Sequence, residues 1–278
     1  MRLAFVKMQG LGNDFVLIDT RTETFVPSEQ AIRALADRRL GVGCDQVLLV
    51  AAPSVAGARV DYRIFNASGE EVEHCGNGVR CVARYLLARG ELALGARATV
   101  NIGGRTVTVM PTSADAVQVD MGVPEFSPQA IPLARAQRAN TYRFALPSGD
   151  AVVAGVVSMG NPHVVIAVAD VATAPVATLG PAMESHVDFP KRVNVGFLQV
   201  MRPDFVRLRV YERGVGETLA CGTGACGAVA VGRLWGQLAE RVRVALPGGE
   251  LEIAWPGEGA PLHMTGPAQW VFEGSLEQ

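Results

Sequence analysis

An internal repeat constrains the fold of this chain more than any other feature. A shift of 146 residues places residues 60–92 on residues 206–238 without a gap, and a shift of 148 places GNDFVLI (12–18) on GNPHVVI (160–166). One insertion in a surface loop explains the difference between the two shifts. The matched segments keep the same order, so we infer a duplication rather than chance similarity. A duplicated chain of 278 residues predicts two similar domains.

Each half has the same succession of strands, turns and one long helix. The segments VDYRIF (60–65) and FVRLRVY (205–211) are rich in β-branched and aromatic residues, which favour strands. Apolar residues at helical spacing follow Cys75, an Ala-rich run follows Cys221, and each segment ends at a glycine. Both cysteines are therefore predicted at a strand-to-helix junction, in an α+β fold.

The domain boundaries follow from the order of these elements. We expect an N-terminal domain of residues 1–123 plus 265–278, which carries Cys75, and a C-terminal domain of residues 124–264, which carries Cys221. Capping signals predict a further helix over residues 28–40, closed by a glycine. Residues 126–158 match no pattern to which a role can be given.

Composition excludes several classes of protein. The formal charge is −2 and no block of Lys and Arg is present, which argues against a nucleic-acid partner. No apolar run reaches the roughly 18 to 20 residues that span a bilayer, and the N-terminus lacks the apolar run of a secretory signal. Five cysteines are an odd number, so reduced thiols in a cytoplasmic protein are expected.

Two similar cysteine segments, EHCGNGVRC (73–81) and LACGTGAC (219–226), carry the chemistry. A thiol at a helix N-terminus has its thiolate stabilised by backbone N–H groups, so its pKa is predicted to fall. The glycines that follow let those N–H groups approach a substrate carboxylate closely. A zinc site would favour close C-x2-C pairs, whereas five and four residues separate the cysteines here. We therefore expect no metal.

Two opposed thiols suggest racemisation or epimerisation. One thiolate would remove a proton from a carbon and a thiol on the other side would return one, so the two sulfurs titrate as a coupled pair. If the two domains face each other across a cleft, equivalent polar residues meet there. These pairs are Asn13 with Asn161, Gln46 with Asn194, Asn66 with Glu212, and Asn77 with Thr223. Because most of the pairs differ, the ligand is expected to have two unlike ends.

The remaining candidates have structural alternatives. His163 has Phe15 at the equivalent position, and it either supports a thiol or substrate or is a structural histidine. Glu212 and Arg213 suit the ammonium and carboxylate groups of a zwitterion, but could be a solvated pair. The other three cysteines, Cys44, Cys81 and Cys226, are interpreted as small buried hydrophobic residues.

The motifs GLGNDF, HCGNGVRC, GNPH and YERGVGETLACGTGAC, in this order, resemble the diaminopimelate epimerase family over nearly the whole chain. The resemblance implies two pseudo-symmetric domains, each a curled mixed or antiparallel sheet around a central helix, with the active site in the interdomain cleft. It also implies interconversion of LL- and meso-2,6-diaminopimelate, in bacterial lysine and peptidoglycan precursor synthesis, without pyridoxal phosphate, another cofactor or a metal.

The same resemblance implies roles for individual residues. Cys75 and Cys221 would be the acid/base thiols, supported by His163 and Glu212. Phe272 would lie at the contact of a homodimer. Substrate would be bound by Asn13, Gln46, Asn66, Gly76, Asn77, Asn161, Asn194, Glu212, Arg213, Gly222 and Thr223.

Two alternatives remain open from the residues alone. A proline or hydroxyproline racemase of similar fold would share the thiol pair, but its pocket would bind a compact imino acid. A thiol-based redox or metal-binding protein would have no need of the paired polar residues.

Overall fold

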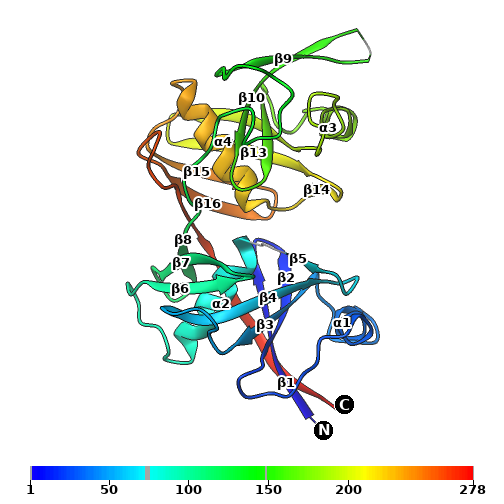
Figure 1. Ribbon diagram of the computed structural model, residues 1–278, viewed down its shortest axis with the longest axis vertical. Coiled ribbons are helices and arrows are strands. Elements are labelled where there is room, and N and C mark those ends of the chain that lie inside the picture. Colours follow the sequence, from blue (N-terminus) through cyan, green and yellow to red (C-terminus); the bar gives the residue numbers. More distant parts are fainter. Residues whose placement is uncertain (1, 73–75, 148, 278) are drawn as a thin grey trace. The chain divides into compact units, whose positions relative to one another are not determined.

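The computed structural model describes residues 2–72, 76–147 and 149–277 (Figure 1). The chain divides into two compact units, and each is described by itself. The first consists of Met1–Asp120 and Thr265–Gln278, and the second of Met121–Met264. Among the described residues, no helix combines the length and apolar character needed to cross a membrane.

The first unit is a mixed sheet with two helices. Its strands are β1 (Arg2–Gly10), β2 (Asn13–Asp19), β3 (Gln46–Ala51), β4 (Ala58–Asn66), β5 (Glu71–Val72), β6 (Ala98–Ile102), β7 (Arg105–Pro111), β8 (Ala116–Asp120) and β18 (Gln269–Glu277), and its helices are α1 (Glu29–Ala36) and α2 (Gly76–Ala88). β2 pairs with β3 in parallel, and so does β4 with β6. The pairs β1–β2, β3–β4, β4–β5 and β6–β7 are antiparallel.

The second unit repeats this arrangement. Its strands are β9 (Tyr142–Ala145), β10 (Ala151–Ser158), β11 (Pro162–Ala167), β12 (Asn194–Arg202), β13 (Phe205–Glu212), β14 (Gly216–Thr218), β15 (Arg241–Leu246) and β16 (Gly249–Ala254), and its helices are α3 (Val176–Glu184) and α4 (Gly222–Leu234). Strand β17 (His263–Pro267) spans the division between the units. The pairs β11–β12 and β13–β15 are parallel, and β10–β11, β12–β13, β13–β14 and β15–β16 are antiparallel.

A duplicated ion pair marks the common origin of the units. Arg63 on β4 makes a bidentate contact with Glu71 on β5, with both N–O distances 2.7 Å. At the equivalent place Arg209 on β13 contacts Glu217 on β14 at 2.5 and 2.9 Å. Identical strand pairing and an identical side-chain clamp confirm the predicted α+β fold of two duplicated units.

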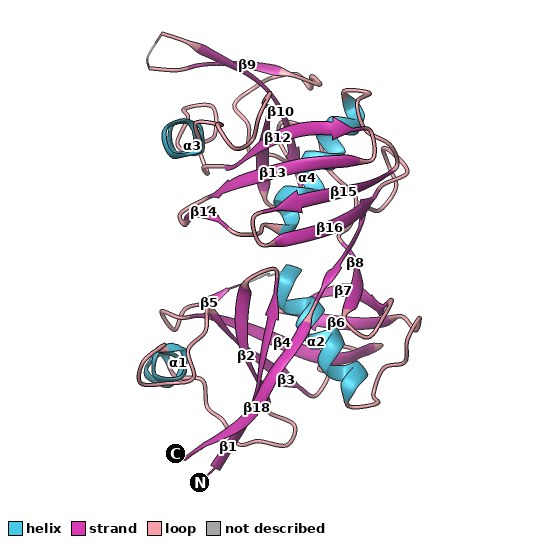
Figure 2. Ribbon diagram, turned by 180° about the vertical axis from the view of Figure 1, so that it is seen from behind, coloured by secondary structure: helices cyan, strands magenta, loops and turns pink. Residues whose placement is uncertain are grey.

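A central helix packs against the sheet of each unit. Helix α2 contacts β1, β2, β7, β8 and β18, while α4 contacts β10, β11, β12, β13 and β16 (Figure 2). The central helices begin where their cysteine segments predict, and Gly90 and Gly236 follow their ends with φ of 71° and 72°. The left-handed backbone at these glycines terminates a helix without steric cost.

Helix α1 is shorter than predicted. Ser28 is its N-cap, as expected, and accepts a hydrogen bond from the backbone N–H of Ala31 at 3.1 Å. The helix ends at Ala36 rather than near residue 40, because Asp37 is extended and its carboxylate accepts the N–H groups of Arg39 and Leu40. A side chain that binds nearby backbone donors competes with helix continuation.

Residues 126–158, which match no sequence pattern with a known role, contribute to the core of the second unit. Strand β9 pairs with β10, and the buried side chains of Ile131, Leu133, Tyr142 and Phe144 join a cluster with Phe197 on β12. This segment is therefore part of the second unit's hydrophobic core.

Candidate active site

The first group of predicted site residues lies at one end of the sheet in the first unit. Asn13 opens β2 after a tight turn in which Leu11 and Gly12 have φ of 58° and 82°. Gln46 opens β3 and pairs across the ladder with Asn66, the last residue of β4. Gly76 and Asn77 open α2. We call Asn13, Gln46, Asn66, Gly76 and Asn77 the first half-site.

Hydrogen bonds fix the orientation of these amides. Gln46 Nε2 donates to Asn66 Oδ1 at 2.9 Å, and Asn77 Nδ2 donates to Asn13 Oδ1 at 3.4 Å. The fully buried Arg80 donates to Asn77 Oδ1 at 2.8 Å. Gln46 Oε1 is buried and has no hydrogen-bond partner among the described residues. Because buried acceptors are normally hydrogen-bonded, Gln46 Oε1 could accept a hydrogen bond from a bound ligand or a water molecule.

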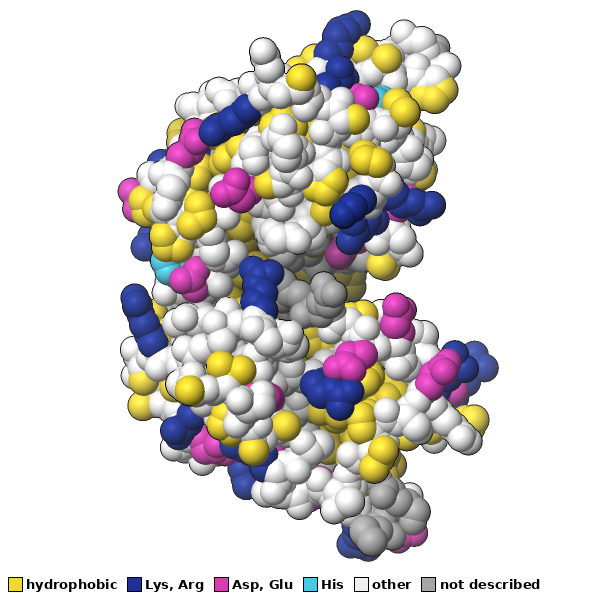
Figure 3. Space-filling model, viewed as in Figure 1, with side chains coloured by type: hydrophobic (Ala, Val, Ile, Leu, Met, Phe, Trp, Pro, Cys, Tyr) yellow, Lys and Arg dark blue, Asp and Glu magenta, His cyan; other side chains and the backbone are white. Residues whose placement is uncertain are grey.

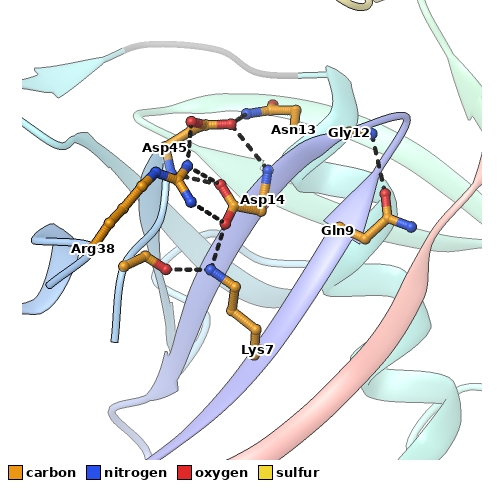
Figure 4. Close-up of polar contacts among 8 residues, drawn as sticks. Lys7, Gln9, Gly12, Asn13, Asp14, Arg38 and Asp45 are labelled. Carbon is orange, nitrogen blue, oxygen red and sulfur yellow. Dashed lines mark hydrogen bonds and ion pairs between the residues drawn. The ribbon is translucent and has the colours of Figure 1, made fainter. Parts of the chain in front are cut away.

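Sequence reasoning missed a charged network behind Asn13 (Figure 4). Asp14 accepts two hydrogen bonds from Arg38, at 2.7 and 3.0 Å, and one from Lys7 at 2.5 Å. Arg38 also contacts Asp45 at 2.8 Å, and Lys7 donates to the carbonyl of Gly43. Partial burial opposes ionisation of Asp14, but these donors hold its pKa well below its usual range. The network ties the starts of β2 and β3 together.

Asp45 fixes which way the amide of Asn13 faces. Asn13 Nδ2 donates to Asp45 Oδ2 at 3.0 Å, and the same oxygen accepts the backbone N–H of Asp14 at 3.1 Å. Because a carboxylate only accepts hydrogen bonds, the amide nitrogen of Asn13 must face Asp45 and its oxygen must face Asn77. The motifs contained a signal for this, since both aspartates adjoin a predicted binding residue, Asn13 or Gln46.

The second group of predicted residues lies at the equivalent end of the second unit. We call Asn161, His163, Asn194, Glu212, Cys221, Gly222 and Thr223 the second half-site. His163 and Asn194 are partners in the parallel ladder of β11 and β12. Asn194 donates to the carbonyl of Pro162 at 3.0 Å and accepts the backbone N–H of Arg213 at 2.9 Å. The guanidinium of Arg213 is exposed and donates to the carbonyl of Lys191 at 3.0 Å.

The repeated asparagines are oriented in opposite senses. Asn161 Oδ1 lies 3.0 Å from Nε2 of His163, and its Nδ2 donates to the Thr223 hydroxyl at 3.3 Å. Burial, together with a smaller contribution from the positive charge of Arg213, lowers the pKa of His163 to about 3, so the imidazole is neutral at pH 7. Its Nε2–H then donates to Asn161. The first asparagine thus turns its nitrogen toward a carboxylate, and the second turns its oxygen toward an imidazole.

Cys221 is the N-cap of α4 and is buried. Its sulfur lies 3.6 Å from the Thr223 hydroxyl. Burial raises the pKa of this thiol well above its usual range, and the nearby Glu212 carboxylate raises it further; hydrogen bonds from Thr223 and the backbone of Gly224 act in the opposite direction. The expectation of a lowered pKa is therefore wrong for Cys221, because burial and a neighbouring anion outweigh the helix N-terminus.

Glu212 connects this thiol to the hairpin of β13 and β14. Thr218 donates its hydroxyl proton to Glu212 Oε1 at 2.6 Å. Burial raises the pKa of Glu212, while its hydrogen bonds with Thr218 and Cys221 favour the carboxylate and lower the pKa. A carboxylate that accepts a hydrogen bond from a thiol is placed to take its proton.

Small residues keep the helix N-termini open. A Cβ atom at Gly224 would lie 3.2 Å from the sulfur of Cys221, and one at Gly78 would lie 2.6 Å from the Tyr62 hydroxyl.

Cys44, Cys81 and Cys226 are buried, as small hydrophobic residues would be. Cys75, the other predicted thiol, lies outside the described residues.

Comparison with known proteins defines the class of fold first. The structure resembles a hydroxyproline epimerase from Agrobacterium vitis, with a TM-score of 0.70 and 13% identity over 99% of this chain and 92% of that chain. It also resembles a predicted epimerase from Pseudomonas aeruginosa, with a TM-score of 0.70 and 17% identity over 99% of both chains. At these identities the likeness establishes a shared two-domain fold.

The sequence comparisons identify the family. A family model described as diaminopimelate epimerase matches residues 5–127 and 155–271. A diaminopimelate epimerase from Alkalilimnicola ehrlichii is 54% identical over 278 residues, covering 99% of both chains. This chain belongs to the diaminopimelate epimerase family.

Proposed function

We propose that this protein is an isomerase that interconverts LL- and meso-2,6-diaminopimelate, using Cys75 and Cys221 as its two acid/base groups. The observation that carries the proposal is the placement of Cys221 at the N-terminus of α4, where the charge of the Glu212 carboxylate acts on its thiol. In this arrangement the Cys221 sulfur can reach a substrate carbon, while the Glu212 carboxylate takes the thiol proton or returns it.

The reaction transfers one proton off the α-carbon and another onto it. A thiolate forms an S–H bond as the C–H bond breaks, and the electron pair is delocalised into the α-carboxylate. The second thiol then gives its proton to the opposite face of the carbon and becomes a thiolate. Cys75 and Cys221 exchange roles when the reaction reverses, and Glu212 accepts the proton of Cys221 when that residue must become the base. No atom is gained or lost.

Backbone and side-chain donors would stabilise the developing charge. The N–H groups of Gly222 and Thr223 lie in the first turn of α4, where hydrogen-bond partners within the helix are lacking. Gly76 and Asn77 hold the same positions in α2. Donors placed where charge develops are often the largest contribution to lowering such a barrier. We assign these groups to the α-carboxylate at the reacting centre.

The two half-sites would also recognise a substrate with two zwitterionic ends. The oxygen of Asn13 and the buried Gln46 Oε1 are acceptors suited to an ammonium group, whereas Asn161 Nδ2 is a donor suited to a carboxylate. Asn66, Asn194, Glu212 and Arg213 complete the proposed binding set. The proposal requires both half-sites to act on one substrate molecule.

Substrate assays test this proposal directly. The wild-type protein is expected to convert LL- to meso-diaminopimelate and back, and to leave proline and hydroxyproline unchanged. Turnover of proline without turnover of diaminopimelate would overturn the substrate assignment. Activity should survive treatment with a chelator and carbonyl reagents, since we propose no metal and no pyridoxal phosphate.

Replacement of Asp45 by Asn is expected to raise KM for diaminopimelate about tenfold, with a smaller effect on kcat. An amide at position 45 can offer an N–H where the carboxylate accepts, so Asn13 would turn over and present a donor to the ammonium group. One mismatched hydrogen bond costs about 1 to 3 kcal/mol. Arg38→Gln is the matched control, because it removes the ion pairs of Arg38 with Asp45 and Asp14 but leaves the contact between Asp45 and Asn13. An equal rise in KM in both variants would contradict the orienting role of Asp45.

We propose further that the protein is a cytoplasmic homodimer in which β18 contributes the contact. Phe272 and Val271 on β18 are 46% and 52% exposed, although both are large and apolar. A pocket of about 460 Å³ lies nearby, lined in part by Tyr85 and Trp270, whose rings stack. On the face drawn in Figure 3, Lys and Arg side chains are interspersed with Asp and Glu. This mixture of charges does not favour binding to the phosphates of a nucleic acid.

Phe272→Glu is expected to convert the dimer to a monomer in sedimentation velocity. A charge placed in an apolar contact is costly to desolvate. Val187→Glu changes a side chain that is 84% exposed in the second unit and should leave the dimer intact. A wild-type protein that sediments as a monomer at micromolar concentration would refute the dimer.

A further inference from the structure

Thr218 lies on the same face of the β13–β14 hairpin as Glu212. In the antiparallel ladder Thr218 is opposite Val210, two residues before Glu212. Alternate residues of a strand point to one face, so the side chains of Thr218 and Glu212 are diagonal neighbours. Their contact is the 2.6 Å hydrogen bond from Thr218 Oγ1 to Glu212 Oε1. The hairpin therefore holds one carboxylate oxygen in place.

The other contacts of this cluster lead to the thiol. Beyond the effect of burial, the negative charge of Glu212 acts on the Cys221 thiol and raises its pKa, and the sulfur of Cys221 lies 3.6 Å from the Thr223 hydroxyl. Glu212 and Cys221 are the titratable groups of the cluster, and Thr218 and Thr223 contribute neutral hydroxyls. Arg213, the next residue along the chain, directs its guanidinium to the carbonyl of Lys191. Thr218 thus binds the carboxylate and not the sulfur.

The repeat shows that this threonine accompanies the carboxylate. The shift of 146 residues places Glu212 on Asn66 and Thr218 on Val72. Asn66 cannot act as a base, Val72 has no hydroxyl, and Asn66 instead accepts a hydrogen bond from Gln46. The two halves share a bidentate Arg–Glu clamp on this hairpin, yet only the second half has the Glu–Thr pair. The hydroxyl therefore occurs with the carboxylate and is absent from the half in which the equivalent residue cannot act as a base.

We propose that Thr218 is a positioning residue for epimerisation: its hydroxyl holds one oxygen of Glu212 and keeps the carboxylate ionised and directed at the Cys221 thiol. This inference rests on the proposed function, in which Glu212 takes and returns the Cys221 proton. A charge-assisted hydrogen bond of this kind both orients a carboxylate and favours its charged form. Thr218 touches neither the sulfur nor the substrate carbon in this account.

Three variants test the role of the hydroxyl. Thr218→Val removes it with little change in shape, and Thr218→Ser restores it. Thr20→Val is the matched control, because the Thr20 hydroxyl makes a part-buried hydrogen bond of 2.8 Å to the carbonyl of Val50 in the first unit. We expect Thr218→Val to lower kcat about 10-fold to 100-fold with KM within about twofold, while the other two variants keep kcat within about threefold.

A second readout needs no substrate. The rate at which iodoacetamide alkylates Cys221, followed by peptide mass spectrometry as a function of pH, reports the ionisation of the Glu212–Cys221 pair. Removing the donor to Glu212 changes the ionisation of that carboxylate, on which the pKa of the thiol depends, so the midpoint should shift in Thr218→Val only.

The outcomes separate the two proposals. An active wild type, with Thr218→Val as fast as wild type or Thr218→Ser as slow as Thr218→Val, would overturn the role of Thr218. An unshifted alkylation midpoint in Thr218→Val would overturn it as well. A wild type inactive on diaminopimelate would overturn the proposed function instead, and the alkylation curves would still decide whether Thr218 acts on the pair.

Discussion

Replacing Cys221 by Ala is expected to lower kcat for diaminopimelate epimerisation by about 10³-fold to 10⁴-fold. Loss of a general acid or base alone costs about 10²-fold to 10⁴-fold, and this sulfur would serve as acid in one direction and base in the other. Because Cys221 is the N-cap of α4 and the Glu212 charge acts on its thiol, we propose that this sulfur, rather than that of Cys226, reaches the reacting carbon. Rates in both directions measure the effect.

Cys226→Ala is the matched control for this change. Cys226 lies in the same helix and is fully buried. Its replacement removes packing from the core and is expected to lower the melting temperature while kcat stays within about threefold of wild type. A Cys221→Ala variant that retained a tenth of the wild-type rate would contradict its role as an acid/base group.

Glu212→Gln is expected to lower kcat by about 10²-fold, because glutamine keeps the shape but cannot accept the Cys221 proton. Burial raises the pKa of Glu212, so its carboxylate is lost as pH falls through that raised value. The wild-type rate should therefore decline on the acid side as Glu212 becomes protonated, and this decline should disappear in the variant. Profiles of kcat against pH test both statements.

Glu217→Gln on the same hairpin provides the control. Glu217 forms the exposed clamp with Arg209, and such a pair contributes about 0 to 1 kcal/mol to stability. This variant should keep both the rate and the acid decline of the wild type. If it lost as much activity as Glu212→Gln, the effect would belong to the hairpin rather than to the base.

The fold class could be predicted from the sequence because the main strands and the central helix occur in both halves, so the pattern of one half supported that of the other. The helices after the two cysteine segments, the strands over 60–65 and 205–211 and the α+β class were all recognised from periodicity and turn residues. Helix α1 is shorter than predicted, because the side chain of Asp37 terminates it before Gly41 is reached. Within residues 126–158, strand β10 corresponds to β1 of the first unit by its pairing, but the two sequences share no recognisable motif, so the repeat did not reveal this match.

The sequence predicted candidate site residues, but it could not predict their electrostatics. The equivalence of Asn13 with Asn161 indicated a pair, whereas only the structure shows that Asp45 and His163 orient them in opposite senses. The pKa of Cys221 was predicted in the wrong direction, because helix position can be seen in a sequence but burial beside Glu212 cannot. The repeat did not indicate Thr218 as a site residue, because its counterpart in the first half, Val72, is apolar and the two do not form a matched polar pair.

The two-thiol mechanism is tested most directly by following deuterium into substrate and product. LL-diaminopimelate is incubated with the wild-type protein in deuterated water. At low conversion the two isomers are separated, and the deuterium content of each is measured by mass spectrometry. We predict that the meso product carries one deuterium at the reacting α-carbon while the recovered LL substrate remains unlabelled, because one sulfur removes the proton and a different, solvent-exchanged sulfur returns another. A product that retained the original proton, or substrate labelled as fast as product, would show a single base and contradict the account.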